Sequence, residues 1–170
     1  QDWKIQGMPT VYSRAQQLQD ALGNCWDRRF QIFINTCRGN AFIDNDRFDL
    51  TDGPNVARTG EWARVNRDNH ELNFINVHWD HQSSETRLAN AQETAAQVND
   101  SLLATVVVGD FNAGCSSGEV AALTHQAQLS TGAQSGIDCI FIRGLTGSGQ
   151  AINASPSDHP AIVAELTITP

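Results

Sequence analysis

Thr105-Val-Val-Val-Gly-Asp-Phe-Asn112 is the clearest buried strand in the chain. Its three consecutive valines leave no polar face, a pattern typical of a strand covered on both sides. Asp110 and Asn112 follow the valines two positions apart, so in an extended chain their side chains point the same way. Because a sheet holds the end of a buried strand rigidly, we expect both side chains to belong to a functional site.

Polar groups that can bind metals or transfer protons stand at the ends of other apolar runs as well. Three further segments share this feature: Asn76-Val77-His78, Ile137-Asp138 and Ser157-Asp158-His159. The candidate site residues in the four segments are two imidazoles (His78 and His159), three carboxylates (Asp110, Asp138 and Asp158) and the amide of Asn112. This set of groups is typical of a site that hydrolyses phosphoesters.

The chain alternates strands and helices without internal repeats. Helices are expected at 13–22, 84–102 and 118–126, and strands at 31–35, 61–67, 72–79, 105–111, 137–142 and 161–168. Ser13 and Gln16 match a helix capping box, and Asn69 marks the turn of an antiparallel hairpin. The segments 38–54, with a short strand near Phe48, and 144–149 are expected to be loops. The pattern predicts a single α/β (α+β) domain over 1–170, with stacked sheets flanked by helices.

Composition sets limits on the class of protein. The 170 residues are 40% hydrophobic and 18% charged, as in an ordinary globular protein with one core. No apolar run approaches the roughly 20 residues that span a bilayer. The formal net charge of −8 repels polyanions, so no stable nucleic-acid complex is expected.

The cysteines indicate an oxidising compartment. Cys25–Cys37 and Cys115–Cys139 are the simplest pairing of the four, each closing a local loop, and none forms a Cys-x-x-Cys metal motif. The chain starts at Gln1 without an apolar leader, which fits a processed product. We therefore expect a secreted protein, extracellular or periplasmic. The alternative, free buried thiols in a cytosolic protein, stays open.

The order of the four segments resembles the endonuclease/exonuclease/phosphatase superfamily, which includes pancreatic-type deoxyribonuclease and the sphingomyelinases. The string His78-Trp79-Asp80-His81-Gln82-Ser83 looks like its bacterial and fungal phosphatase-like members. The resemblance covers about residues 16–170. It implies a four-layer α/β sandwich, with two mixed β-sheets face to face and helices outside. It also implies a phosphoester substrate (nucleic acid, lipid or small-molecule phosphate).

The chemistry suggests a role for each proton-handling group. His159 is the candidate general base, since neutral imidazole accepts a proton near pH 7. Asp138 would accept a hydrogen bond from its other ring nitrogen and fix the tautomer. His78 would donate to a phosphate oxygen. Arg64 and Arg87 are weaker candidates for phosphate contact.

The resemblance also implies a divalent cation, Mg²⁺ or another such as Mn²⁺ or Ca²⁺. Asp158 would ligate it, and Asp110 and Asn112 would orient the phosphate or the nucleophile, or hold a second metal. One expected ligand is missing, because members of the superfamily carry a Glu after an early strand and no Glu precedes Glu61 here. If the segment 5–12 is that strand, Tyr12 stands near the Glu position, and the cation would be held weakly.

Three hypotheses remain open at this point. The chain is a metal-dependent phosphoesterase (nuclease, phosphodiesterase or phosphatase), a catalytically impaired relative that binds a ligand or protein, or a fragment. The histidines outside the site, His70, His81 and His125, are expected to be polar loop or helix-end residues.

Overall fold

The computed structural model describes residues 14–153 and 157–168. The strand expected at 5–12 and the capping residue Ser13 lie outside the described residues.

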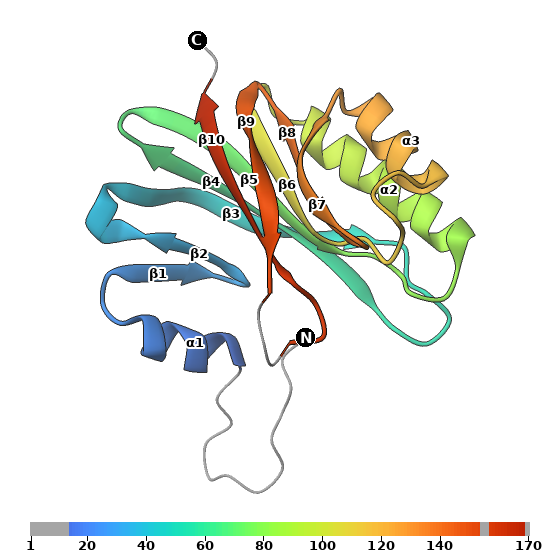
Figure 1. Ribbon diagram of the computed structural model, residues 1–170, viewed down its shortest axis with the longest axis horizontal. Coiled ribbons are helices and arrows are strands. Elements are labelled where there is room, and N and C mark those ends of the chain that lie inside the picture. Colours follow the sequence, from blue (N-terminus) through green and yellow to red (C-terminus); the bar gives the residue numbers. More distant parts are fainter. Residues whose placement is uncertain (1–13, 154–156, 169–170) are drawn as a thin grey trace, which may run out of the picture.

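A six-stranded mixed sheet forms the centre of the molecule (Figure 1). Its strand order is β3 (Asn40–Leu50), β4 (Arg58–Arg67), β5 (His70–His78), β6 (Ala104–Asp110), β8 (Asp138–Arg143) and β7 (Ser130–Ser135). Strands β5 and β6 are parallel, and the other neighbouring pairs are antiparallel. Since a parallel pair needs a long crossover, helix α2 (Ser84–Asn99) connects these two strands.

Helices α2 and α3 (Gly118–Gln126) cover one face of this sheet. Each begins at a serine, Ser83 or Ser117, whose hydroxyl accepts a backbone N–H three residues on. The core between the helices and the sheet contains these buried residues: Ile75, Val77, Ala91, Ala95, Val98, Val107, Val120, Leu123 and Phe141. The main hydrophobic core therefore lies between this face of the sheet and the two helices.

The other face of the sheet packs against a hairpin. Strands β9 (Leu145–Ile152) and β10 (Ala161–Ile168) pair antiparallel, and Leu145, Leu166 and Ile168 lie against Val106 and Ile142. The backbones of the two strands approach closely at Gly147 and Gly149. A Cβ at Gly147 would lie 2.0 Å from the Glu165 carbonyl oxygen.

A second hairpin lies beside β3 and β4. Helix α1 (Arg14–Leu22) leads into β1 (Trp26–Arg29) and β2 (Ile32–Asn35), which are followed by a short 3₁₀ helix, η1 (Thr36–Arg38). Ile34 packs on Ala63 and Val65 of β4. A disulfide between Cys25 and Cys37 joins the two ends of this hairpin.

The expected α/β sandwich is confirmed: a mixed sheet, a second sheet layer and outer helices are all present. In the described residues the second layer is made of antiparallel pairs rather than a mixed sheet. The hairpin of β4 and β5 is also confirmed, with Asp68 and Asn69 both at positive φ in its turn.

Two loop predictions were wrong. Residues 40–50 form the long edge strand β3, whose alternation is broken by a bulge between Phe42 and Asp44 and whose exposed positions are mostly polar. Residues 145–152 form β9, where Gly147 and Gly149 allow the backbone to approach β10 closely and do not form a flexible turn. Strands β1 and β7 were not predicted at all.

Both expected disulfides are present, Cys25–Cys37 and Cys115–Cys139. They support an oxidising, extracellular or periplasmic setting. Within the described ranges, none of the helices has the length and apolar character that crossing a membrane requires.

Candidate active site

Strand pairing brings three of the predicted residues to one edge of the central sheet. Asp110 at the end of β6 stands opposite His78 of β5 on one side and Asp138 of β8 on the other. His78 Nε2 lies 3.6 Å from Asp110 Oδ2. The backbones of β5 and β6 are unusually close here, because a Cβ at Gly109 would lie 1.9 Å from the Val77 carbonyl oxygen.

His159 completes the group from the second layer. It lies just before β10, and its Nδ1 is 2.7 Å from Asp138 Oδ2. One ligand atom from each of Asp110, Asp138 and His159 can be chosen so that all three lie within 4.8 Å of one another. The predicted convergence of these sequence-distant residues is therefore present in the fold.

Asn112 supports the loop that follows Asp110. Its backbone N–H donates to Asp110 Oδ1 at 2.8 Å, and its side-chain amide donates to the Trp79 carbonyl at 2.9 Å. The residue is left-handed, with φ of 48°, so the chain is no longer extended after Asp110. The sequence argument that an extended chain points the side chains of Asp110 and Asn112 the same way therefore does not apply here.

Phe111, between these two residues, anchors the loop. Its ring is fully buried and makes edge contacts with Trp79 at 4.7 Å and Phe141 at 5.3 Å between ring centroids. Such aromatic contacts fix the position of the polar residues on either side of Phe111.

Asp158 is exposed and lies outside the group of converging ligand atoms. Its charge contributes, after those of Asp138 and Asp110, to the raised pKa of His159. Asp158, which was expected to ligate the cation, is thus near the group but does not belong to it.

The two histidines differ in their ionisation. The hydrogen bond that His159 donates to Asp138, and then the charge of Asp138, raise the pKa of His159 above its ordinary value. Burial, and then the charge of Arg58, lower the pKa of His78, although Asp110 opposes this. Near neutral pH, His78 is therefore the neutral imidazole and His159 holds its proton more tightly.

Arg58 is a site residue that sequence reasoning missed. It is 6% exposed and lines a cavity of about 320 Å³ together with His78, Asn76 and Glu61. Its Nη2 donates to His81 Nδ1 at 2.9 Å, and its Nε has no hydrogen-bond partner among the described residues. The register of the β4–β5 hairpin could have indicated Arg58. Extended two positions beyond the pair of Glu61 and Asn76, it puts Thr59, the neighbour of Arg58, opposite His78.

The arginines considered from sequence are engaged elsewhere. Arg64 pairs with Asp44 and Glu71, and Arg87 pairs with Glu119. His81, expected to be an ordinary polar residue, instead contacts Arg58.

The donor set fits a divalent cation and also proton transfer. Carboxylate oxygens are the preferred ligands of hard cations, and the three converging residues are partly solvent-accessible. A carboxylate-bound imidazole with its second nitrogen available can accept a proton from water.

No protein-family model and no curated protein matches the sequence. Among solved structures, a mannosyl-6-phosphatase from Bacteroides thetaiotaomicron matches with 18% identity and a TM-score of 0.71, over 80% of this chain and 70% of that chain. An endonuclease/exonuclease/phosphatase from Bacteroides vulgatus matches with 19% identity and a TM-score of 0.71, over 80% and 69%. The catalytic domain of human Nocturnin with bound sulfate matches with 15% identity and a TM-score of 0.65, over 81% and 63%.

The chain therefore has the fold of the endonuclease/exonuclease/phosphatase proteins, as the four sequence segments indicated. The likeness at these identities concerns the fold.

Proposed function

We propose that the chain is a secreted, divalent-metal-dependent phosphoesterase that hydrolyses its substrate with a water activated by His159. The observation that carries this proposal is the 2.7 Å contact between His159 and Asp138, with Asp110 beside it at the end of β6. A phosphatase among the structures of the same fold supports the reaction class.

The residues divide the work as follows. His159 removes a proton from water, and Asp138 holds the imidazole in the required orientation. Asp110 and Asn112 orient the phosphate and the attacking water. His78 and Arg58 donate hydrogen bonds to the non-bridging phosphate oxygens, where charge accumulates in the transition state.

Asp110 and Asn112 would hold the divalent cation, Mg²⁺, Mn²⁺ or Ca²⁺, which would neutralise charge on the phosphoryl group. Asp138 stands close enough to assist, whereas Asp158, also expected as a ligand from the sequence, lies outside the converging group. Because the Glu ligand expected from the superfamily is absent from the sequence before Glu61, we expect weak binding of the cation.

The test is hydrolysis of p-nitrophenyl phosphate, bis(p-nitrophenyl) phosphate and plasmid, each with EDTA and then with added cation. We expect metal-dependent turnover that falls at least about 100-fold in His159→Ala. His125→Ala, an exposed histidine at the end of α3, is the matched control and should retain the rate. Equal rates in His159→Ala and the unmodified protein would refute the assignment.

A second candidate function, binding of a phosphorylated ligand without turnover, rests on the missing Glu. It predicts no hydrolysis of any of the three substrates, together with heat released on titration of inorganic phosphate. Loss of that heat in Arg58→Gln would locate the binding at this cavity.

A further inference from the structure

The cavity beside His78 contains more positive charge than one phosphate requires. Three arginines from three elements line it: Arg28 of β1, Arg47 of β3 and Arg58 of β4. Glu61 is the single carboxylate among the described residues that line the cavity. This concentration of cations is notable in a chain whose formal net charge is −8.

Arg58 is a buried cation without a direct ion pair. A guanidinium that is 6% exposed normally has a carboxylate partner, because an unpaired buried charge is costly. Within the described residues Arg58 contacts His81 and forms no ion pair, although the buried carboxylate of Asp80 lies near enough to feel its charge. No described carboxylate that lines the cavity is paired with this arginine.

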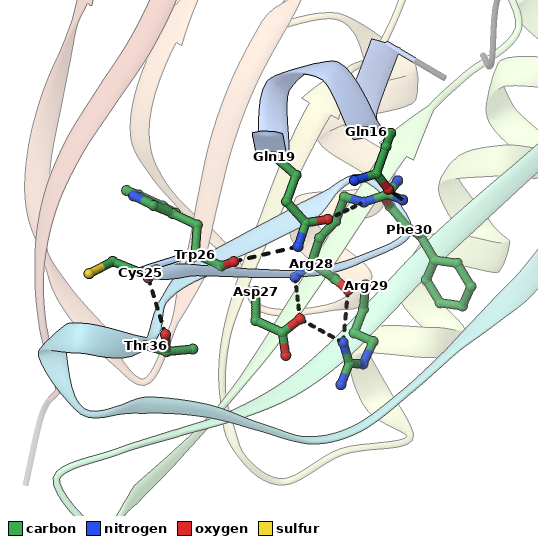
Figure 2. A network of polar contacts seen from close by, with 9 residues as sticks. All are labelled: Gln16, Gln19, Cys25, Trp26, Asp27, Arg28, Arg29, Phe30 and Thr36. Carbon is green, nitrogen blue, oxygen red and sulfur yellow. Dashed lines mark hydrogen bonds and ion pairs between the residues drawn. The ribbon is translucent and has the colours of Figure 1, made fainter. Parts of the chain in front are cut away.

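In the part of the chain that the structure describes, the guanidinium of Arg28 is held in place by neutral acceptors (Figure 2). It donates through Nε to Gln19 Oε1 at 3.3 Å, through Nη1 to the Phe30 carbonyl at 2.9 Å and through Nη2 to Gln16 Oε1 at 3.4 Å. These contacts fix the direction of the guanidinium without neutralising it. By contrast, the adjacent Arg29 is paired with Asp27 at 2.9 Å and does not line the cavity.

Arg47 is oriented by the ring of Phe30, whose centroid lies 4.5 Å from its guanidinium carbon. Its Nη2 is 3.8 Å from Glu61 Oε1. Glu61 is shared, since its Oε2 also accepts hydrogen bonds from the Gln31 backbone and the Asn76 amide. The positive charge of Arg47 is thus only partly balanced by Glu61.

The cationic groups enter the cavity from different strands. Arg47 pairs across the sheet with Glu61, and Glu61 with Asn76, so the backbone of Arg47 lies two strands away from the strand of His78. Two strand spacings are roughly 10 Å between backbones, so Arg47 and His78 approach the cavity from opposite sides of β4. A second anionic group on the same substrate would bind Arg28 and Arg47.

We propose that Arg28 and Arg47 form a subsite for a second phosphate, so that the preferred substrate is a small bisphosphate of a sugar or a nucleoside. This proposal rests on the proposed function, since His78 and Arg58 are taken to bind the phosphate that is hydrolysed. The cavity of about 320 Å³ suits a molecule of that size. The acidic surface of the rest of the chain disfavours a polyanion.

The test compares matched substrates that differ by one phosphate. Phosphate release is measured from glucose 6-phosphate against glucose 1,6-bisphosphate, and from adenosine 5′-monophosphate against adenosine 3′,5′-bisphosphate. We expect KM at least about 10-fold lower for the preferred bisphosphate than for its monophosphate. Whichever pair shows the larger difference identifies a sugar or a nucleoside as the carrier.

Arg47→Gln and the double variant Arg28→Gln/Arg47→Gln should remove that difference, and Arg29→Gln should keep it. Arg47 is 56% exposed on its side chain, so its replacement does not threaten folding even if loss of Arg28 loosens α1. Equal KM values for both members of each pair in the unmodified protein, or an undiminished difference in Arg47→Gln, would overturn the proposal.

Calorimetry on His159→Ala with the same four compounds and Mg²⁺ separates the two proposals. Preferential binding of a bisphosphate that depends on Arg47, together with no hydrolysis by the unmodified protein, would refute the proposed function and support the subsite. His159-dependent hydrolysis without any bisphosphate preference would support the function and refute the subsite.

Discussion

The two histidines at the sheet edge occupy opposite electrostatic surroundings although they flank the same carboxylate. His159 is hydrogen-bonded to Asp138 and faces three acidic groups, whereas His78 feels the positive charge of Arg58. A site that keeps one imidazole neutral and lets the other bind a proton has separate groups for hydrogen-bond donation and proton transfer.

The first prediction concerns their titration in metal-free protein. We expect His159 to titrate above its ordinary pKa of 6.5 and His78 below it, measured from the imidazole C–H signals by NMR. Asp138→Asn should lower the pKa of His159, because the hydrogen bond and the charge of Asp138 are its main causes. The pKa of His78 should hardly change. If both histidines titrate together, the proposed division of roles fails.

The second prediction follows from the same shift by linkage. Because the pKa of His159 is higher in the folded protein than in the unfolded one, its pairing with Asp138 stabilises the fold fully below about pH 6.5. That stabilisation is lost as the pH rises through the folded-state pKa. In urea unfolding at pH 5.5 and 8.5, Asp138→Asn should therefore destabilise the protein more at the lower pH. A variant equally destabilised at both pH values would contradict the pairing.

At the scale of single elements, the contact between β5 and β6 sets the distance between His78 and Asp110. Gly109 makes it possible, since its φ is 151° and an added Cβ would meet the Val77 backbone. Neither strand can move back easily, because Ile75, Val77 and Val107 are buried under α2 and α3.

The third prediction is that Gly109→Ala lowers the free energy of unfolding by at least about 2 kcal/mol and reduces hydrolysis further than stability explains. Gly118→Ala is the matched control: this glycine opens α3 and has no heavy atom within 4 Å of an added Cβ. It should be neutral or stabilising by about 0.5 kcal/mol. Urea unfolding measures both, and equal effects would show that the close approach is unimportant.

The elements that the sequence predicted well are those with a strong apolar run or period. Strand β6 is a continuous apolar run, and helix α2 and the hairpin of β4 and β5 have a regular apolar period, because each buries a face in the main core. Strands β3 and β9 have none, since one is a bulged edge strand whose exposed positions are mostly polar and the other consists largely of small and polar residues. Their structure depends on neighbouring strands that local sequence does not specify.

The candidate site divides in a similar way. Asp110, Asp138 and His159 were found because each stands at the end of an apolar run, and strand pairing then brings them together. Arg58 was missed because nothing local distinguishes it from the other arginines. Its importance comes from its burial beside His78. The sequence indicates that position only when the pairing of β4 and β5 is continued past Glu61 and Asn76.

At the scale of the whole molecule, the two disulfides hold different parts of the functional surface. Cys115–Cys139 ties the loop after β6 to β8, directly beside Asp138, and Cys115 Sγ lies 3.3 Å from the Asp138 carbonyl oxygen. Cys25–Cys37 closes the hairpin that carries Arg28 and Phe30 into the cavity. One crosslink thus supports the position of Asp138 beside His159, and the other supports the wall of the cavity.

The last prediction separates these two supports by removing each crosslink in turn. The closed loops span sequence separations of 24 and 12 residues, so serine replacement of either pair should lower the free energy of unfolding by about 3 kcal/mol. Without Cys115–Cys139, the NMR titration of His159 should move toward its ordinary pKa, because Asp138 loses its anchor. Without Cys25–Cys37, that titration should stay unchanged while the preference for a bisphosphate weakens, because the hairpin loses the constraint at its base. If both replacements alter the His159 titration to the same extent, the hairpin of β1 and β2 and the end of the sheet with Asp138 form one cooperative unit. The hairpin could then not be treated as a separate wall of the cavity.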